Sequence, residues 1–147
     1  MKKVKCFLGL IVALSFTTKI IAQPNFQWVN TMGSAGNDFG KEVVVDATGN
    51  LYIIGEFRNT VDFDPGPAMV NLTSFGNNDV FVQKLDKNGN LIWVKQFGGT
   101  DLDQGSSIDI DGNGDIIISG SFRGTADFDP GPGTNILTAT GAYYDTF

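Results

Sequence analysis

The sequence predicts an all-β protein made of antiparallel β-propeller blades, and three observations carry this prediction. Residues 28–76 match residues 93–141 at 21 of 49 positions without a gap, so the chain repeats itself at an offset of 65 residues. Within the repeat, apolar residues alternate with variable ones, which is the period of half-buried strands. Short D-x-x-G-[ND] segments separate the alternating runs, and none of these runs has the period of a helix. Internal repetition at a fixed period is typical of solenoids, propellers and tandem arrays.

Each repeat unit is expected to contain four strands joined by hairpins. In the first unit these strands are expected at residues 41–46, 51–57, 79–86 and 91–97. The first pair joins through Asp46–Asn50 and the second pair through Asp86–Asn90, both of the D-x-x-G-[ND] type. In such a turn the aspartate caps the backbone with its side chain, and the glycine supplies the positive φ of a tight hairpin. Four antiparallel strands per unit is the content of one propeller blade.

The number of units falls short of a closed ring, which takes about four to eight blades. Residues 41–105 are interpreted as one complete blade, and residues 106–147 as a truncated second blade. Residues 23–40 match the last strand of a blade and the loop after it, and in a ring this strand would close the circle. We therefore expect an incomplete propeller fragment, the N-terminal piece of a longer protein whose downstream blades pack on it intramolecularly. The alternative is that several copies assemble into one ring.

Residues 1–22 have the organisation of a secretory signal peptide. A basic start with three lysines precedes a run of 11 mainly apolar residues, Cys6 to Phe16, and cleavage is expected after Ala22. This run is too short for a stable membrane span. Cys6 opens the run, whereas the lipid-bearing cysteine of a bacterial lipoprotein follows it. The sequence therefore predicts a secreted protein, extracellular or at the cell surface.

The composition excludes several classes of function. The 147 residues include 16 acidic and 10 basic side chains, and the net charge of −6 argues against a nucleic-acid partner. The chain has no histidine, which excludes histidine-based catalysis and most zinc sites. Serine and threonine are present without a base that would activate them as nucleophiles. We therefore expect no enzyme activity from this segment.

The candidate metal-binding residues lie in the segment DFDPGP, which is identical in both repeats. Asp62 and Asp64 in the first copy, and Asp127 and Asp129 in the second, are two residues apart, so each pair points the same way along an extended chain. Converging carboxylates beside a turn with free carbonyl groups suit Ca²⁺, which takes about six to eight oxygen ligands. The structural interpretation is that Pro-Gly forms a turn, the aspartates cap it and the phenylalanine fills the core.

Trp28 and Trp93 occupy the same place in successive repeats. Packing between blades is the favoured interpretation of this fixed position, and stacking on a sugar is the alternative. If the units are arranged in a circle, the two tryptophans must have equivalent surroundings.

Three motifs follow one another along the first unit. They are an entry segment with glycine and aspartate, then D-x-x-G-N-x-Y-x-x-G, and then D-x-F-V-x-K-L-D-x-x-G. The residues that form them are Gly33, Asp38, Gly40, Asp46, Gly49, Asn50, Tyr52, Gly55, Asp79, Phe81, Val82, Lys84, Leu85, Asp86 and Gly89. This set resembles the bacterial secreted β-propeller repeat of the SBBP type, in a variant with the DFDPGP insertion between its second and third strands. The resemblance implies an all-β, extracellular protein from a family mostly without assigned activity.

The function expected from these features is that of a secreted or cell-surface β-propeller repeat protein, acting as a binding or structural module for a protein or a glycan. One alternative is the non-catalytic N-terminal part of a secreted carbohydrate-active enzyme. Another is a structural spacer in a large adhesin. A catalytic constellation downstream would favour the enzyme, and many further repeats without unique insertions would favour the spacer.

Overall fold

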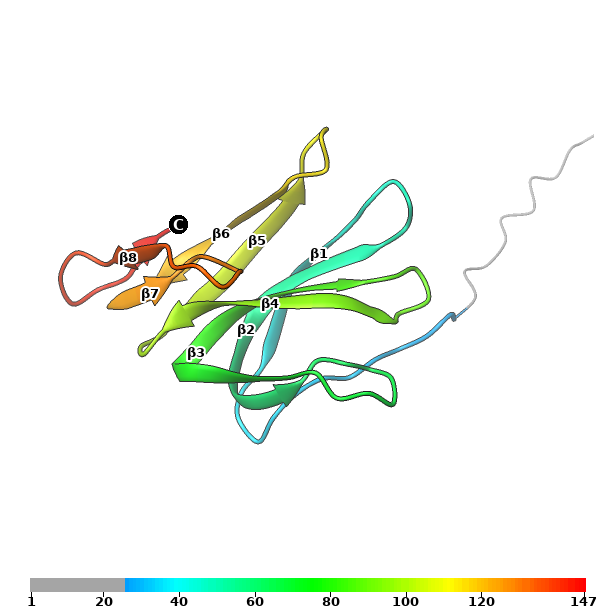
Figure 1. Ribbon diagram of the computed structural model, residues 1–147, viewed down its shortest axis with the longest axis horizontal. Coiled ribbons are helices and arrows are strands. Elements are labelled where there is room, and N and C mark those ends of the chain that lie inside the picture. The colour runs from blue at the N-terminus through cyan, green and yellow to red at the C-terminus, as the bar shows by residue number, and fades with distance from the viewer. Residues whose placement is uncertain (1–25) are drawn as a thin grey trace, which may run out of the picture.

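The computed structural model describes residues 26–147, and the regular structure of this part of the chain is all β (Figure 1). Nine strands, paired antiparallel, form two sheets in these residues, and no helix occurs among them. The predicted all-β, antiparallel fold is therefore confirmed. The predicted signal peptide, residues 1–22, lies outside the described residues. No helix between residues 26 and 147 is long and apolar enough to cross a membrane.

The first repeat unit is a four-stranded meander. It consists of β1 (Phe39–Val45), β2 (Leu51–Asp62), β3 (Asn71–Leu85) and β4 (Leu91–Gly99), each antiparallel to the next. All four predicted strands are present. The two central strands are longer than predicted, because the ladder between them continues into the DFDPGP segment, with Thr60 opposite Thr73 and Asp62 opposite Asn71. The insertion is therefore the tip of one long hairpin.

The second repeat unit divides its strands between two sheets. β5 (Gln104–Ile110), β6 (Ile116–Phe122) and β9 (Asp145–Thr146) form a three-stranded sheet. The hairpin of β7 (Thr125–Asp127) and β8 (Ile136–Thr138) instead joins the sheet of the first unit, because Gly98 and Gly99 at the end of β4 pair with β7. This pairing joins the two units through backbone hydrogen bonds.

The strand β9 of the second unit pairs with β6 as β3 pairs with β2 in the first unit, and the sequence before β9 contains one extra residue. Phe122 lies opposite Asp145 in the same way as Phe57 lies opposite Asp79. The carboxylate of Asp145 accepts a hydrogen bond from Thr140 N at 2.9 Å, matching the bond from Phe75 N to Asp79 at 3.1 Å. This short strand therefore corresponds to the second half of β3 in the first unit.

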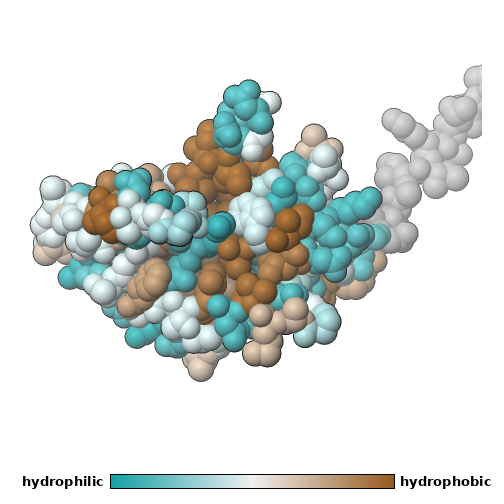
Figure 2. Space-filling view, viewed as in Figure 1, coloured by the Kyte–Doolittle hydropathy of each residue, from teal (hydrophilic) through white to brown (hydrophobic). Residues whose placement is uncertain are grey.

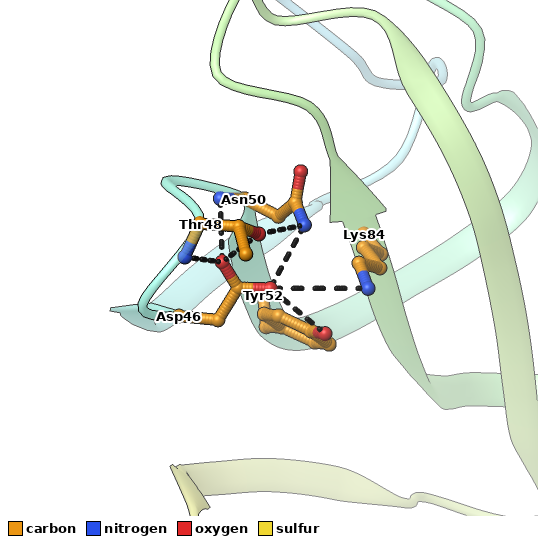
Figure 3. Close-up of polar contacts among 5 residues, drawn as sticks. All are labelled: Asp46, Thr48, Asn50, Tyr52 and Lys84. Atoms are coloured by element: carbon orange, nitrogen blue, oxygen red, sulfur yellow. Dashed lines mark hydrogen bonds and ion pairs between the residues drawn. The ribbon is translucent and has the colours of Figure 1, made fainter. Parts of the chain in front are cut away.

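The D-x-x-G-[ND] segments at 46–50, 86–90 and 111–115 form hairpin turns, as predicted. In the turn between β1 and β2, Asp46 Oδ1 accepts hydrogen bonds from the backbone amides of Thr48 and Asn50, each at 2.9 Å. Figure 3 shows this carboxylate surrounded by donors, which also include the Tyr52 hydroxyl and the Lys84 ammonium group at 3.9 Å. The hydroxyl of Thr48, as the largest cause, and the side-chain and backbone donors of Asn50 hold the pKa of Asp46 well below its usual range. The glycine of this turn, Gly49, has the expected positive φ of 90°.

Two apolar clusters cover the two faces of the first unit. One cluster lies between the units, and its buried members are Tyr52, Ile54, Val80, Val82, Phe97 and Ile108. The other lies on the opposite face of the same sheet, with Phe57, Val61, Phe63 and Phe81 buried and Met32 packed against them. The first unit therefore buries apolar side chains on both faces of its sheet.

The segment before β1 contacts the first unit as β4 contacts the second. Trp28 lines a hollow with Leu51 and Ile53, and Trp93 lines another with Ile116 and Ile118, which are the repeat equivalents of those two residues. The two tryptophans therefore share this pair of equivalent neighbours, while Trp28 also donates a hydrogen bond to Lys87 O at 3.3 Å and Trp93 packs edge-on against Tyr52. Residues 26–32 form no strand, although they match the last strand of a repeat, because the described residues contain no third strand of a preceding unit with which they could pair.

Candidate functional site

The DFDPGP aspartates cap the tips of the two long hairpins. Asp62 Oδ1 accepts the backbone amides of Asp64 at 3.0 Å and Val70 at 2.9 Å. Asp127 Oδ1 accepts the equivalent amides of Asp129 at 3.0 Å and Asn135 at 2.8 Å. The backbone donors of Asp129 and Asn135 hold the pKa of Asp127 below its usual value. In each copy, one carboxylate oxygen thus accepts a backbone amide from both ends of the turn.

The second aspartate of each copy caps the Pro-Gly turn that follows. Asp64 Oδ1 accepts the amide of Gly66 at 2.6 Å, and Asp129 Oδ1 accepts that of Gly131 at 2.6 Å. Between the two aspartates of the first copy, Phe63 is 1% exposed, and its carbonyl accepts a hydrogen bond from Gln83 Nε2 at 2.7 Å. The predicted structural roles of this segment, a capped turn and a core phenylalanine, are both present.

The calcium site at these four aspartates stays a prediction. Within residues 26–147, no three or more histidine, cysteine, aspartate or glutamate side chains are grouped as the ligands of a metal ion would be. Arg123, which precedes the second copy of the segment, pairs with Asp101 at 3.4 Å rather than with Asp127 or Asp129. A cation here would therefore draw on carbonyl groups and water in addition to the remaining carboxylate oxygens.

If Ca²⁺ binds these turns, it raises the melting temperature of the protein, because a ligand that binds only the folded state stabilises it. At a hundred times its Kd the gain is about 2.7 kcal/mol. The double variant Asp64→Ala, Asp129→Ala is expected to abolish the calcium-dependent shift in a thermal melt, whereas Asp109→Ala is expected to keep it. An unchanged melting temperature of the unsubstituted protein in saturating Ca²⁺ would remove the cation from consideration.

A mixed polar and apolar hollow of about 290 Å³, which we call the junction hollow, lies where the two units meet. It is lined by Phe75 from the β3 strand, Lys95 and Gln96 from β4, and Asp127 and Asp129 from the second DFDPGP turn. The pairing of Gly98 with Asp127 brings that turn to the end of β4. Two of the four predicted site residues are therefore brought together at this hollow, and Asp62 and Asp64 lie outside it.

Sequence reasoning missed the other residues of the junction hollow. Phe75 and Lys95 correspond to Thr140 and Asn30 in the neighbouring repeats, so neither position carries the same residue type twice. The one feature that Phe75 and Lys95 share in the sequence is that each differs from its repeat equivalent. This difference marks them as site residues only once the strand pairing between the units is known.

A buried pair of carboxylates lies close to the junction hollow. Asp79 and Asp103 are both 0% exposed, and both approach Gly98, where a Cβ atom would lie 2.7 Å from Asp103 Oδ2 and 3.1 Å from Asp79 Oδ1. Asp79 Oδ2 accepts a hydrogen bond from Gln96 Nε2 at 2.6 Å, while Asp79 Oδ1 has no partner. Burial raises the pKa of Asp79 to about 6, and it also raises the pKa of Asp103.

Glu42 links the two units near their first strands. Its carboxylate Oε2 accepts hydrogen bonds from the Ser107 hydroxyl and from the backbone amide of Ile108, the latter at 2.8 Å. The two donors lie beside an irregularity in β5, where the backbone departs from the regular ladder with β6. These hydrogen bonds hold the pKa of Glu42 below its usual value. The repeat equivalent of Glu42 is Ser107 itself, so this link does not recur in the second unit.

Apolar side chains gather on the face seen in Figure 2, below the polar tip of the β5–β6 hairpin. A second hollow between the units, of about 430 Å³, has an almost wholly apolar lining that includes Trp93, Phe97, Ile118 and Phe147. It adjoins the apolar cluster shared by the two units, and its lining offers few polar groups to a ligand. The junction hollow is therefore the better candidate for a site that selects its ligand through polar contacts.

The fold and the junction together define an all-β protein of two tandem repeat units, each built of antiparallel strands. The chain is similar to an uncharacterized WD repeat-containing protein, L264, of Acanthamoeba polyphaga mimivirus, with 26% identity over an alignment of 113 residues. The match takes in 67% of this chain and 8% of that relative, so the chain spans less than a tenth of the relative's length. No family model matches the sequence, and no solved structure matches the chain.

Proposed function

We propose that this chain belongs to a secreted or cell-surface β-propeller of the SBBP type, in which residues 26–147 provide one complete blade and parts of two others. The repeat-equivalent pair of isoleucine and leucine neighbours that Trp28 and Trp93 share supports this proposal, because blades around an axis repeat one packing scheme at successive junctions. The similarity to a WD repeat-containing protein agrees with it.

The role of this propeller is to bind an extracellular glycan or protein. The observation that carries this role is the junction hollow, which combines an exposed aromatic ring, an ammonium group and two carboxylates in one concave place. Such a lining has the chemistry of a ligand site, since a few polar groups orient the ligand and an apolar surface contributes contact area. The test is retention of a partner by the immobilised chain on arrays of glycans and extracellular proteins. The absence of any ligand of either class would contradict the binding role and favour a structural spacer.

The predicted secretion is tested by expressing the chain with a C-terminal epitope tag in bacterial cells and locating the tag. We expect the tag in the medium, or accessible to antibody on intact cells, because residues 1–22 direct export. Deleting residues 2–22 should retain essentially all of the tagged chain inside the cells. Intracellular accumulation of the full chain with its leader uncleaved would contradict a secreted protein.

A further inference from the structure

The junction hollow has fixed acceptors on one wall. Asp127 Oδ1 and Asp129 Oδ1 are occupied by backbone amides of their own turn, and this occupation fixes the orientation of both carboxylates. Asp127 Oδ2 accepts no hydrogen bond within residues 26–147, whereas Asp129 Oδ2 lies against its own turn, where a Cβ atom on Gly133 would be 2.2 Å away. Oriented carboxylates suit the hydroxyl groups of a polyol, because each hydroxyl can donate one hydrogen bond.

The opposite wall supplies an apolar surface and a cation. Phe75 is 63% exposed although its backbone is anchored by the hydrogen bond from its amide to Asp79. An aromatic ring held in this way offers a flat face to the C–H groups of a sugar ring. Lys95 has no ion-pair partner in residues 26–147, and its ammonium group can donate to a hydroxyl or ring oxygen. The hollow thus presents acceptors, a donor and an apolar platform around about 290 Å³.

The charge of the site selects among sugars. Two aspartates and one lysine line the hollow, and the chain carries a net charge of −6. Uronic acids and sulfated sugars would bring further negative charge to this place, where like charges repel. A neutral sugar avoids this repulsion and can still contact the aspartates, the lysine and the aromatic ring of the lining.

We propose that the junction hollow binds a single neutral hexose residue of a glycan, with its hydroxyl groups on Asp127 and Asp129 and its C–H face on Phe75. The proposal rests on the binding role proposed above and names the class of ligand for it. Because the hollow is built from two adjacent units, it requires no residue outside the described part of the chain. A closed ring would repeat the carboxylate wall at each copy of DFDPGP, whereas Phe75 and Lys95 are present at this junction alone among residues 26–147.

The test is a titration of the full chain with methyl α-mannoside, methyl β-galactoside and methyl β-glucoside, in which saturation-transfer NMR measures the binding. We expect at least one of these hexosides to bind with a Kd below about 10 mM, which is the range of a single-sugar site. Phe75→Thr and Asp129→Asn should each weaken that binding by about tenfold, since each removes one part of the lining. Phe75→Thr introduces the residue found at the equivalent position 140, and Asp129→Asn keeps an acceptor for the Gly131 amide, so both variants should fold.

Asp64→Asn is the matched control, because it makes the same change in the first DFDPGP turn, outside the hollow. It should leave the affinity for the hexoside unchanged. The proposal is overturned if no hexoside binds, if Phe75→Thr and Asp129→Asn bind as well as the unsubstituted chain, or if methyl glucuronide binds more tightly than the glucoside. A protein or charged-glycan ligand found on the arrays would in those cases leave the binding role standing and remove only the neutral hexose.

Discussion

Replacing Gly55 by alanine is expected to destabilise the fold by about 3 kcal/mol or more, which is a large fraction of the stability of a small domain. A Cβ atom at this position would lie 2.0 Å from the backbone carbonyl oxygen of Phe39 and 2.7 Å from the ring of Phe81. The first contact is with backbone inside the β1–β2 ladder, so relief requires the two strands to separate. The second contact would displace a ring that is 3% exposed and belongs to the Phe57 cluster.

Gly40→Ala is the control for this prediction, because Gly40 lies directly opposite Gly55 in the same strand pair. A Cβ atom on Gly40 would meet nothing within 4 Å, and the change is expected to alter stability by less than about 0.5 kcal/mol. Urea unfolding followed by tryptophan fluorescence measures both variants. Gly120→Ala should repeat the large effect, since its Cβ would lie 2.1 Å from the Gln104 carbonyl oxygen. Equal stability of the Gly55 and Gly40 variants would show that the close strand approach is absent.

The turns and strands could be predicted because their causes are local. An aspartate followed three residues later by glycine forms its turn through bonds within five residues, as Asp46 and Gly49 do. Alternation along 51–57 fixes which side chains share a face, whatever the sheet packs against. The equivalent neighbours that Trp28 and Trp93 share followed from the repeat itself, because the positions that the two repeats have in common pack alike.

The junction hollow could not be predicted in this way, because it depends on pairing between units. Nothing local indicates that β7 would pair with Gly98 and Gly99 of the preceding unit, yet this pairing places Asp127 beside Lys95. The length of β2 and β3 was underestimated for a related reason. The proline-containing segment was interpreted as an interruption between two strands, whereas Thr60 and Thr73 extend the ladder and their hydroxyls lie 2.8 Å apart.

The buried acidic pair also required three-dimensional information. Asp79 and Asp103 are 24 positions apart in the sequence, and each looks like one more turn-capping aspartate in a chain with 14 of them. Only the approach of both to Gly98 distinguishes them, since it removes both carboxylates from water. A carboxylate buried without a cationic partner costs free energy, and protonation relieves this cost.

The stability of the protein should therefore fall as the pH rises from about 4 to above 6. The pKa of Asp79 is about 6 in the folded protein and 3.8 as the ordinary value, mainly because of burial. Between these two values the folded state holds a proton that the unfolded state has released, so raising the pH favours unfolding. The shift corresponds to an upper limit of about 3 kcal/mol. Burial raises the pKa of Asp103 as well, with Asp101 contributing through its charge, and this acts in the same direction.

The capping carboxylates act in the opposite direction, at lower pH. The pKa values of Glu42, Asp46, Asp86, Asp111 and Asp127 are all lowered by hydrogen bonds in the folded protein. Their stabilising effect is present above the unfolded-state pKa and is lost as the pH falls below it. The two groups of carboxylates together place the stability maximum on the acidic side of neutrality, which distinguishes this protein from one stabilised by ordinary surface charges.

Asp79→Asn should remove most of the loss above pH 4 and make the protein more stable than the unsubstituted chain at pH 8. The amide oxygen can still accept the bonds from Phe75 N and Gln96 Nε2, and the NH₂ group takes the place of the unpartnered Oδ1 on the side of Asp103. Asp145→Asn, at the equivalent and less buried position of the second unit, should keep the full pH dependence. Urea unfolding at intervals between pH 4 and pH 8 measures the slopes, and an Asp79→Asn variant that loses stability as steeply as the unsubstituted chain would mean that Asp79 is ionised throughout this range.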